Sequence, residues 1–148
     1  MAITQALCTS FKTQLMTATH DFTTTTGDVF KLALFRAQAS ISGTFGAGTT
    51  NYSDMGADQA TGTNYTAGGS ALTNVTPTSS GTTAYTDFAD LVFSNVTITT
   101  SGCLIYNSSK SNKAVAVFNF GGDKTATAGD MTIIFPTADA SNAIIRLV

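Results

Sequence analysis

Side chains that could move protons or attack a substrate are scarce in this chain of 148 residues. It contains one histidine, two cysteines, nine aspartates and no glutamate. Proton transfer near neutral pH normally depends on histidine or on a carboxylate whose pKa is raised. His20 falls at the end of an expected N-terminal helix, and a helix C-terminus is compatible with a positively charged imidazole. We therefore expect no catalytic residues and no enzymatic activity.

Two pairs of aspartates could act as carboxylate pairs, namely Asp87 with Asp90 and Asp54 with Asp58. Each pair lies among residues typical of turns and loops, which is the simpler interpretation. Calcium needs six to eight oxygen ligands, and no Asp-x-Asp-x-Asp-Gly run supplies them locally. If calcium were bound, GGDKTATAGD at 121–130 would be the more plausible location. We expect no metal and no cofactor.

The same segment superficially resembles a phosphate-binding loop, because Lys124 and Thr125 follow two glycines. The Gly-Lys-Thr order is missing, and a strand is expected after the segment. A phosphate loop needs the backbone amides of a following helix. Residues 121–130 therefore predict a hairpin turn.

The charges give no sign of a nucleic-acid or membrane partner. The net charge is −2, and the seven basic residues are scattered, with only Lys110 and Lys113 close together. Phosphate binding needs a clustered basic surface. No stretch approaches the roughly 20 apolar residues of a membrane span, and the N-terminus lacks a signal-peptide pattern. We expect assembly in a cytoplasm, with Cys8 and Cys103 as two buried thiols rather than a disulfide.

Composition favours β-structure in a single domain spanning 1–148. The chain has 28 threonines, 13 serines and 13 glycines, and charged residues make up only 11%. Threonine suits the half-buried surface of a strand, whereas the absence of glutamate removes a good helix former.

One amphipathic helix is expected over residues 1–20. Ile3, Leu7, Phe11 and Leu15 recur at intervals of four, and the TTTTG run at 23–27 ends the pattern. This apolar stripe could cover the open end of the domain or dock on another subunit.

Residues 29–36 (VFKLALFR) predict a strand that is well buried on one side. Residues 37–70 then lose periodicity and predict a long polar loop excursion with short edge strands and possible partner contacts. Its large side chains, together with two from the helix, are the candidate interface residues: Phe11, Leu15, Phe45, Tyr52, Met55 and Tyr65.

The rest of the chain predicts short strands separated by turns. Pro77 should stop pairing after residues 70–77, a turn is expected at 79–83, and the phase change at Ser94 and Asn95 indicates a bulge or turn. Further strands are expected at 103–107, 113–120, 131–136 and 144–148. The fold class is mainly β, an antiparallel β-sandwich or jelly-roll-like domain with one N-terminal amphipathic helix.

Several segments in a specific order resemble a family of small virion structural proteins of tailed bacteriophages, often of aquatic and soil hosts. They are MAITQALCTSFKTQL, GDVFKLALF, GTNYTAGGSALTNVTP, TTAYTDFADLVFSNVTIT, LIYN and AVAVFNFGGDKTATAGDMTIIFPTADASNAIIRL. The resemblance runs nearly end to end. It implies a particle component present in many copies, located in the virion and assembled in the host cytoplasm.

Two positions in the particle remain open. The first is a capsid cement or decoration protein that stabilises the head lattice, which the absence of repeats and heptads favours over a long fibre. The second is a tail, neck or fibre component, in which Tyr52, Tyr65 and Tyr85 could stack on sugars. Cement proteins usually act as symmetric oligomers, so the expected partners are the chain itself, as a dimer or trimer, and the major capsid protein or another virion protein.

Overall fold

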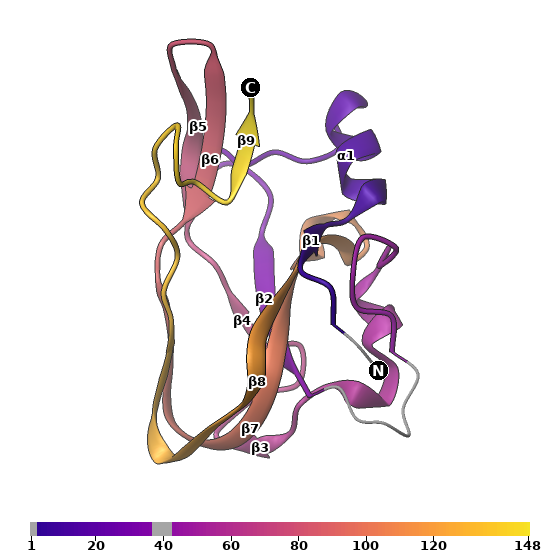
Figure 1. Ribbon diagram of the computed structural model, residues 1–148, viewed down its shortest axis with the longest axis vertical. Helices are drawn as coiled ribbons and strands as arrows, with labels where there is room; N and C mark the ends of the chain where they lie inside the picture. Colours follow the sequence, from indigo (N-terminus) through magenta and orange to yellow (C-terminus); the bar gives the residue numbers. More distant parts are fainter. Residues whose placement is uncertain (1–2, 37–42) are drawn as a thin grey trace.

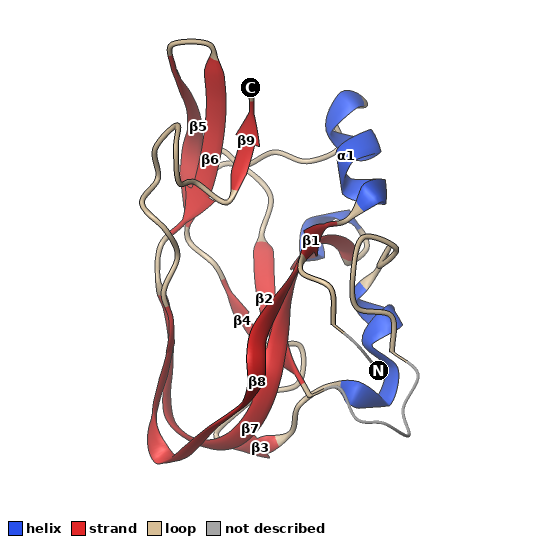
Figure 2. Cartoon of the chain, viewed as in Figure 1, coloured by secondary structure: helices blue, strands red, loops and turns tan. Residues whose placement is uncertain are grey.

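The computed structural model describes residues 3–36 and 43–148, and these form a mainly β fold (Figures 1 and 2). The helical segments are α1 (Thr9–Met16) and two short 3-10 helices, η1 (Tyr52–Asp58) and η2 (Ser108–Lys110). The strands are β1 (Ala6–Leu7), β2 (Phe30–Phe35), β3 (Gly62–Thr63), β4 (Ser70–Ala71), β5 (Asn74–Ser80), β6 (Thr83–Phe88), β7 (Leu91–Asn107), β8 (Lys113–Ile133) and β9 (Ile145–Leu147).

The described strands build two antiparallel sheets. The larger has six strands in the order β1-β8-β7-β2-β4, with β3 added on β7, and the smaller has the order β5-β6-β9. Every pairing within them is antiparallel. The prediction of a mainly β, antiparallel fold is therefore confirmed.

Strands β7 and β8 form one long hairpin that bends sharply, as the lower part of Figure 1 shows. The hairpin predicted at 121–130 is wrong, because β8 runs through that segment without interruption. Positive φ angles at Gly121 and Gly122 and a register shift near Ala128 bend the strand instead of ending it. The bulge predicted at Ser94 and Asn95 is confirmed by the register shift between Phe93 and Val96.

The bend divides this hairpin into two limbs. The near limb pairs Gly102–Asn107 of β7 with Lys113–Asn119 of β8, next to the turn at η2. The far limb pairs Leu91–Thr100 with Lys124–Ile133. Strand β2 extends the near limb into a sheet, because all six of its residues pair with residues 102–107.

The larger sheet has two buried faces at β2 and the near limb. Residues directly opposite each other on antiparallel strands share a face. The front face contains Phe30, Leu32, Leu34, Cys103 and Ile105, and the back face contains Ala33, Phe35, Leu104 and Tyr106. All nine are at most 3% exposed, so the prediction that residues 29–36 form a strand well buried on one side is confirmed, and the opposite face is covered as well.

The smaller sheet covers the front face. The Phe30 ring lies 5.6 Å from the Phe88 ring of β6, and Phe22 stacks on Phe30 at 4.3 Å. Phe88 in turn lies 5.8 Å from Phe135, beyond the end of the far limb. The far limb and the smaller sheet thus stand opposite β2 and the near limb.

The predicted excursion at 37–70 instead covers the back face over its described part. Phe45 stacks on Phe35 at 4.1 Å, and Tyr52 stacks on Tyr106 at 4.7 Å. Residues 37–42 of that prediction lie outside the described residues. Short edge strands were expected there, and β3 and β4 confirm them. The segment is polar on average because only a few of its side chains are needed to cover the sheet.

The N-terminal helix is much shorter than the predicted span of 1–20. Residues Ala6 and Leu7 pair with Val117 and Ala116 of β8, so the chain is extended before α1 begins at Thr9. Backbone pairing with a sheet edge here overrides the four-residue periodicity. The prediction for residues 1 and 2 lies outside the described part.

Pro77 does not stop the strand that contains it. Strand β5 continues to Ser80, and its register with β6 shifts between Val75 and Thr78. A bulge accommodates the missing proline N–H on this edge strand. The turn predicted at 79–83 is confirmed between β5 and β6, and β9 confirms the last predicted strand.

Candidate functional site

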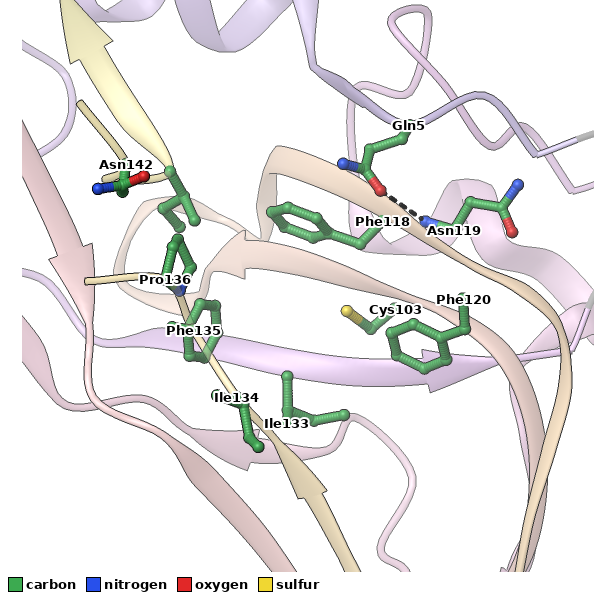
Figure 3. A pocket seen from close by; sticks show the side chains of 11 residues that line it. Gln5, Cys103, Phe118, Asn119, Phe120, Ile133, Ile134, Phe135, Pro136 and Asn142 are labelled. Carbon is green, nitrogen blue, oxygen red and sulfur yellow. Dashed lines mark hydrogen bonds between the residues drawn. The ribbon is translucent and has the colours of Figure 1, made fainter. Parts of the chain in front are cut away.

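An apolar groove lies between the two limbs of the β7–β8 hairpin (Figure 3). It encloses about 410 Å³. Phe118 and Phe120 come from the front face of β8 next to the bend, whereas Ile133 and Phe135 approach from the end of the far limb. We define the apolar groove by its apolar lining: Phe118, Phe120, Ile133, Ile134, Phe135, Pro136 and Ile144.

The groove is open because these side chains are only partly covered by their own chain. Phe118, Phe120, Ile133, Phe135 and Ile144 are half-buried, in contrast to the fully buried residues of the front face. Ile134 is 76% exposed. Isolated exposed apolar residues are ordinary, but a contiguous group around a hollow is typical of a binding surface.

Polar groups at the rim of the groove are amides. The Gln5 Oε1 accepts a hydrogen bond from the Asn119 N–H at 3.4 Å, and the Asn119 Nδ2 donates to the Ile3 carbonyl at 3.1 Å. Asn142 donates through Nδ2 to both oxygens of Asp139, at 3.0 and 2.9 Å. No charged side chain lines the main hollow. The surface therefore suits an uncharged, apolar contact.

Cys103 forms part of the floor of the groove but is not a reactive nucleophile. Its side chain is 1% exposed, and burial raises its pKa well above the usual thiol range. Burial likewise raises the pKa of Cys8 to about 11. A nucleophilic cysteine needs a stabilised thiolate, which burial disfavours. The prediction of two buried thiols without a disulfide is confirmed.

His20 belongs to a hydrogen-bonded cluster at the other end of the near limb. Its Nε2 lies 2.7 Å from the Gln14 Oε1, and its Nδ1 lies 2.9 Å from the Asn107 Nδ2. The Asn107 Nδ2 also donates to Asp28 at 2.8 Å. An Nε2–H that donates to Gln14 leaves Nδ1 as the acceptor for Asn107, which is the neutral imidazole.

Burial lowers the pKa of His20 below the ordinary histidine value, and nearby Lys113 and Lys110 act in the same direction, whereas Asp28 opposes them. The prediction that His20 falls at the end of the N-terminal helix is wrong, because α1 ends at Met16, and the ring packs 5.0 Å from Phe11. The cluster ties α1 to β7.

The aspartate pairs occupy structural positions. Asp87 is fully buried and accepts hydrogen bonds from the N–H groups of Phe88 and Ile144, and its pKa is raised by burial. Asp54 accepts from the N–H of Thr50 and of Asn51 at the start of η1. Residues 121–130 contribute an ion pair, Asp123 with Arg36 at 2.6 Å. Across 3–36 and 43–148, no three His, Cys or Asp side chains gather as metal ligands would.

Comparison of this chain with models of protein families, with curated proteins and with solved structures found no match. In the part of the chain that the structure describes, no helix is long and apolar enough to cross a membrane.

The six predicted interface residues lie mainly inside the chain. Phe11 and Met55 are 0% and 1% exposed, and Phe45 is 5% exposed, so they have almost no surface to offer a partner. Leu15, Tyr52 and Tyr65 are half-buried, and the Tyr65 hydroxyl accepts a hydrogen bond from the Leu34 N–H at 2.8 Å. Phe45 and Tyr52 pack on the back face of the sheet, against Phe35 and Tyr106. Phe11 instead packs against His20 and Phe22, which lie beside Phe30 of the front face.

The apolar groove was missed by sequence reasoning. Its lining residues come from strands expected at 113–120, 131–136 and 144–148. The sequence pattern of a strand does not distinguish an apolar residue that is fully buried from one that is half-buried. Only the bend of β8 brings these segments together around a hollow. The one available signal was the tight apolar run IIFP at 133–136, which has apolar residues on both faces.

Proposed function

We propose that this protein is a non-enzymatic structural component of a bacteriophage particle, most specifically a capsid cement protein that stabilises the head lattice. The resemblance to virion proteins supports the particle assignment. The observation that carries the structural role is the apolar groove, because a hollow of about 410 Å³ lined by aromatic and aliphatic side chains, with no charged group, suits protein docking.

At the finer level of fold, we propose that the two sheets form an open β-sandwich. Contacts between Phe30 and Phe88 support face-to-face packing, and the groove is the side at which the two layers do not close. Such a body is stiff, since its front face is filled by fully buried side chains. A jelly-roll connectivity remains a prediction.

A cement protein acts by contacting several neighbouring subunits at once. In this chain the threonine-rich hairpin of β5 and β6 extends beyond the body (Figure 1), with residues 78–82 exposed. Its uncharged hydroxyl groups can hydrogen-bond to polar surfaces at little desolvation cost compared with charged groups. The hairpin would then provide a polar contact with neighbouring capsid subunits, and the groove an apolar contact with another copy of the protein.

The test is the number of copies in purified virions of the encoding phage, measured by quantitative mass spectrometry. Hundreds of copies per particle, together with a loss of heat resistance when the protein is removed, support the head position. A small multiple of six or twelve supports the alternative, a tail, neck or fibre component. Absence from the particle overturns both.

A carbohydrate-binding role at the tail is the weaker part of that alternative. The rings of Tyr52 and Tyr65 lie against Tyr106 and Phe93, at 4.7 and 5.4 Å, which reduces the ring surface available to a sugar. Tyr85 on β6 is half-buried. A glycan array probed with the purified chain gives a direct answer, and no signal removes this role.

A further inference from the structure

A lysine stands at one end of the apolar groove, and two aspartates stand at the other, one of them, Asp139, near Arg146. Lys124 borders the hollow that continues the groove towards the bend, together with Phe120 and Ile134. Asp139, which binds Asn142, stands at the opposite end, and Asp90 accepts a hydrogen bond from the Phe135 N–H at 2.8 Å. The stretch between the two ends is apolar.

The register of the far limb places Lys124 and Asp90 at different positions along it. Lys124 pairs with Thr100 beside the bend, whereas Ile133 pairs with Leu91, the residue that follows Asp90. Lys124 and Asn142, the partner of Asp139, line two different hollows, and these hollows share Phe120, Ile133 and Ile134.

We propose that the apolar groove is a homodimer interface, in which a second copy docks groove to groove about a twofold axis and places Lys124 of each copy against the acidic end of the other. A twofold interface uses the same patch on both copies, so that patch must complement itself. Opposite charges at the two ends of an apolar strip meet this condition, because a half-turn exchanges the ends.

The apolar centre supplies the contact area in this arrangement. Ile134, 76% exposed, projects at the middle of the strip, with Phe135 and Phe120 on either side (Figure 3). Docking of two such surfaces covers apolar side chains that water otherwise contacts, whereas the charged ends fix the orientation. A parallel placement is disfavoured because Lys124 would meet Lys124 and Asp139 would meet Asp139.

This proposal is independent of the place of the protein in a virion. A chain that is monomeric in solution leaves the copy-number test unaffected. Conversely, a chain absent from virions can still dimerise.

The experiment is sedimentation equilibrium of the purified full chain from micromolar to millimolar concentration. The wild type is expected to form a dimer, and Ile134→Asp is expected to weaken it by about tenfold or more, as for a central interface residue. The matched control is Met16→Asp, since Met16 is 82% exposed at the end of α1, away from the groove. A monomeric wild type, or equal weakening by both variants, overturns the proposal.

A charge-reversal pair tests the orientation. Lys124→Asp places an acidic side chain opposite Asp90 and Asp139 of the other copy, and we expect about threefold or more weakening that shrinks at high salt. Lys12→Asp, on the exposed side of α1, is the control for the change in net charge. If Lys12→Asp weakens the dimer as much as Lys124→Asp, the twofold arrangement is wrong.

Discussion

The two limbs of the β7–β8 hairpin are built from the same two strands. They differ in how many neighbouring strands and covering side chains the rest of the chain supplies to each. The near limb is flanked by β2 on one side and by β1 on the other, and both of its faces are covered. Among the described strands, β3 alone pairs with the far limb from outside the hairpin, through Gly62 and Thr63. Along Lys124–Ile133, no described strand pairs with the outer edge of β8.

The backbone groups at the end of β2, on the edge that faces away from β7, also have hydrogen-bond partners. The Leu34 N–H donates to the Tyr65 hydroxyl, and the Leu34 carbonyl accepts from the Ala60 N–H at 3.0 Å. The Arg36 N–H donates to the Asp58 carbonyl at 2.8 Å. A two-stranded ribbon is only marginally stable in water, whereas a covered multi-stranded sheet is stable by itself. The near limb is therefore the stable frame of the protein, and the far limb is the part that gains most from a neighbour.

Truncation of apolar side chains at the two limbs should give the largest effect, a difference in the free energy of unfolding that is lost. Phe35→Ala removes a fully buried ring that stacks on Phe45, and we expect it to lower the free energy of unfolding by about 3–5 kcal/mol. Ile133→Ala, at the end of the far limb, removes a half-buried side chain and should cost about 1 kcal/mol. Urea denaturation measures both, and equal losses would remove the distinction between the limbs.

Hydrogen exchange should separate the limbs without mutation. Backbone amides at Leu104 and Val117 should exchange only on global unfolding, whereas those along Lys124–Ile133 that face away from β7 should exchange at least about 100-fold faster. The measurement belongs at low concentration, where any dimer is dissociated. Uniform protection along β8 would contradict the comparison.

Two glycines with positive φ sharpen the comparison further. A Cβ on Gly69, at φ 73°, would lie 1.8 Å from the Leu32 carbonyl oxygen, so Gly69→Ala should cost about 2–4 kcal/mol. Gly121 has the same φ but nothing within 4 Å, and Gly121→Ala should cost only about 1 kcal/mol for its left-handed backbone. Thermal unfolding of the two variants checks the difference.

The smallest expected effect is the pH dependence of the His20 cluster. Because the folded-state pKa of His20 is lowered, its contribution to stability is complete above about pH 6.5 and is lost as the pH falls through the folded value. The ring is partly exposed, so we expect less than about 1 kcal/mol. His20→Gln should flatten the stability profile between pH 7.5 and 5.5 relative to wild type. An unchanged profile would show that the ring is not held neutral.

The sequence predicted the structure correctly at positions where neighbouring residues alone determine the conformation. The alternation at residues 30–35 predicted β2, and the phase change at Ser94 and Asn95 predicted a bulge. The two buried thiols also followed from local chemistry.

Prediction failed where a distant strand decided the outcome. GGDKTATAGD carries every sign of a turn, yet β7 continues alongside it and keeps it extended. The periodicity of the sequence predicts a helix at Ala6 and Leu7, yet these residues pair with the edge of β8 as a strand. The apolar groove depends on both the bend and the C-terminal segment, so no local pattern contains it.

The hairpin that joins the two limbs also sets an order of assembly during folding. Asn107 and Lys113 pair next to the turn at η2, whereas Leu91 and Ile133 are the pair farthest from it. Closing short loops costs less entropy than closing long ones, so pairing should begin at the turn and proceed towards the bend. The near limb would then form early, and the walls of the groove would meet only in the last step. A copy that is still folding therefore offers no completed groove, which delays association until each chain has reached its final shape.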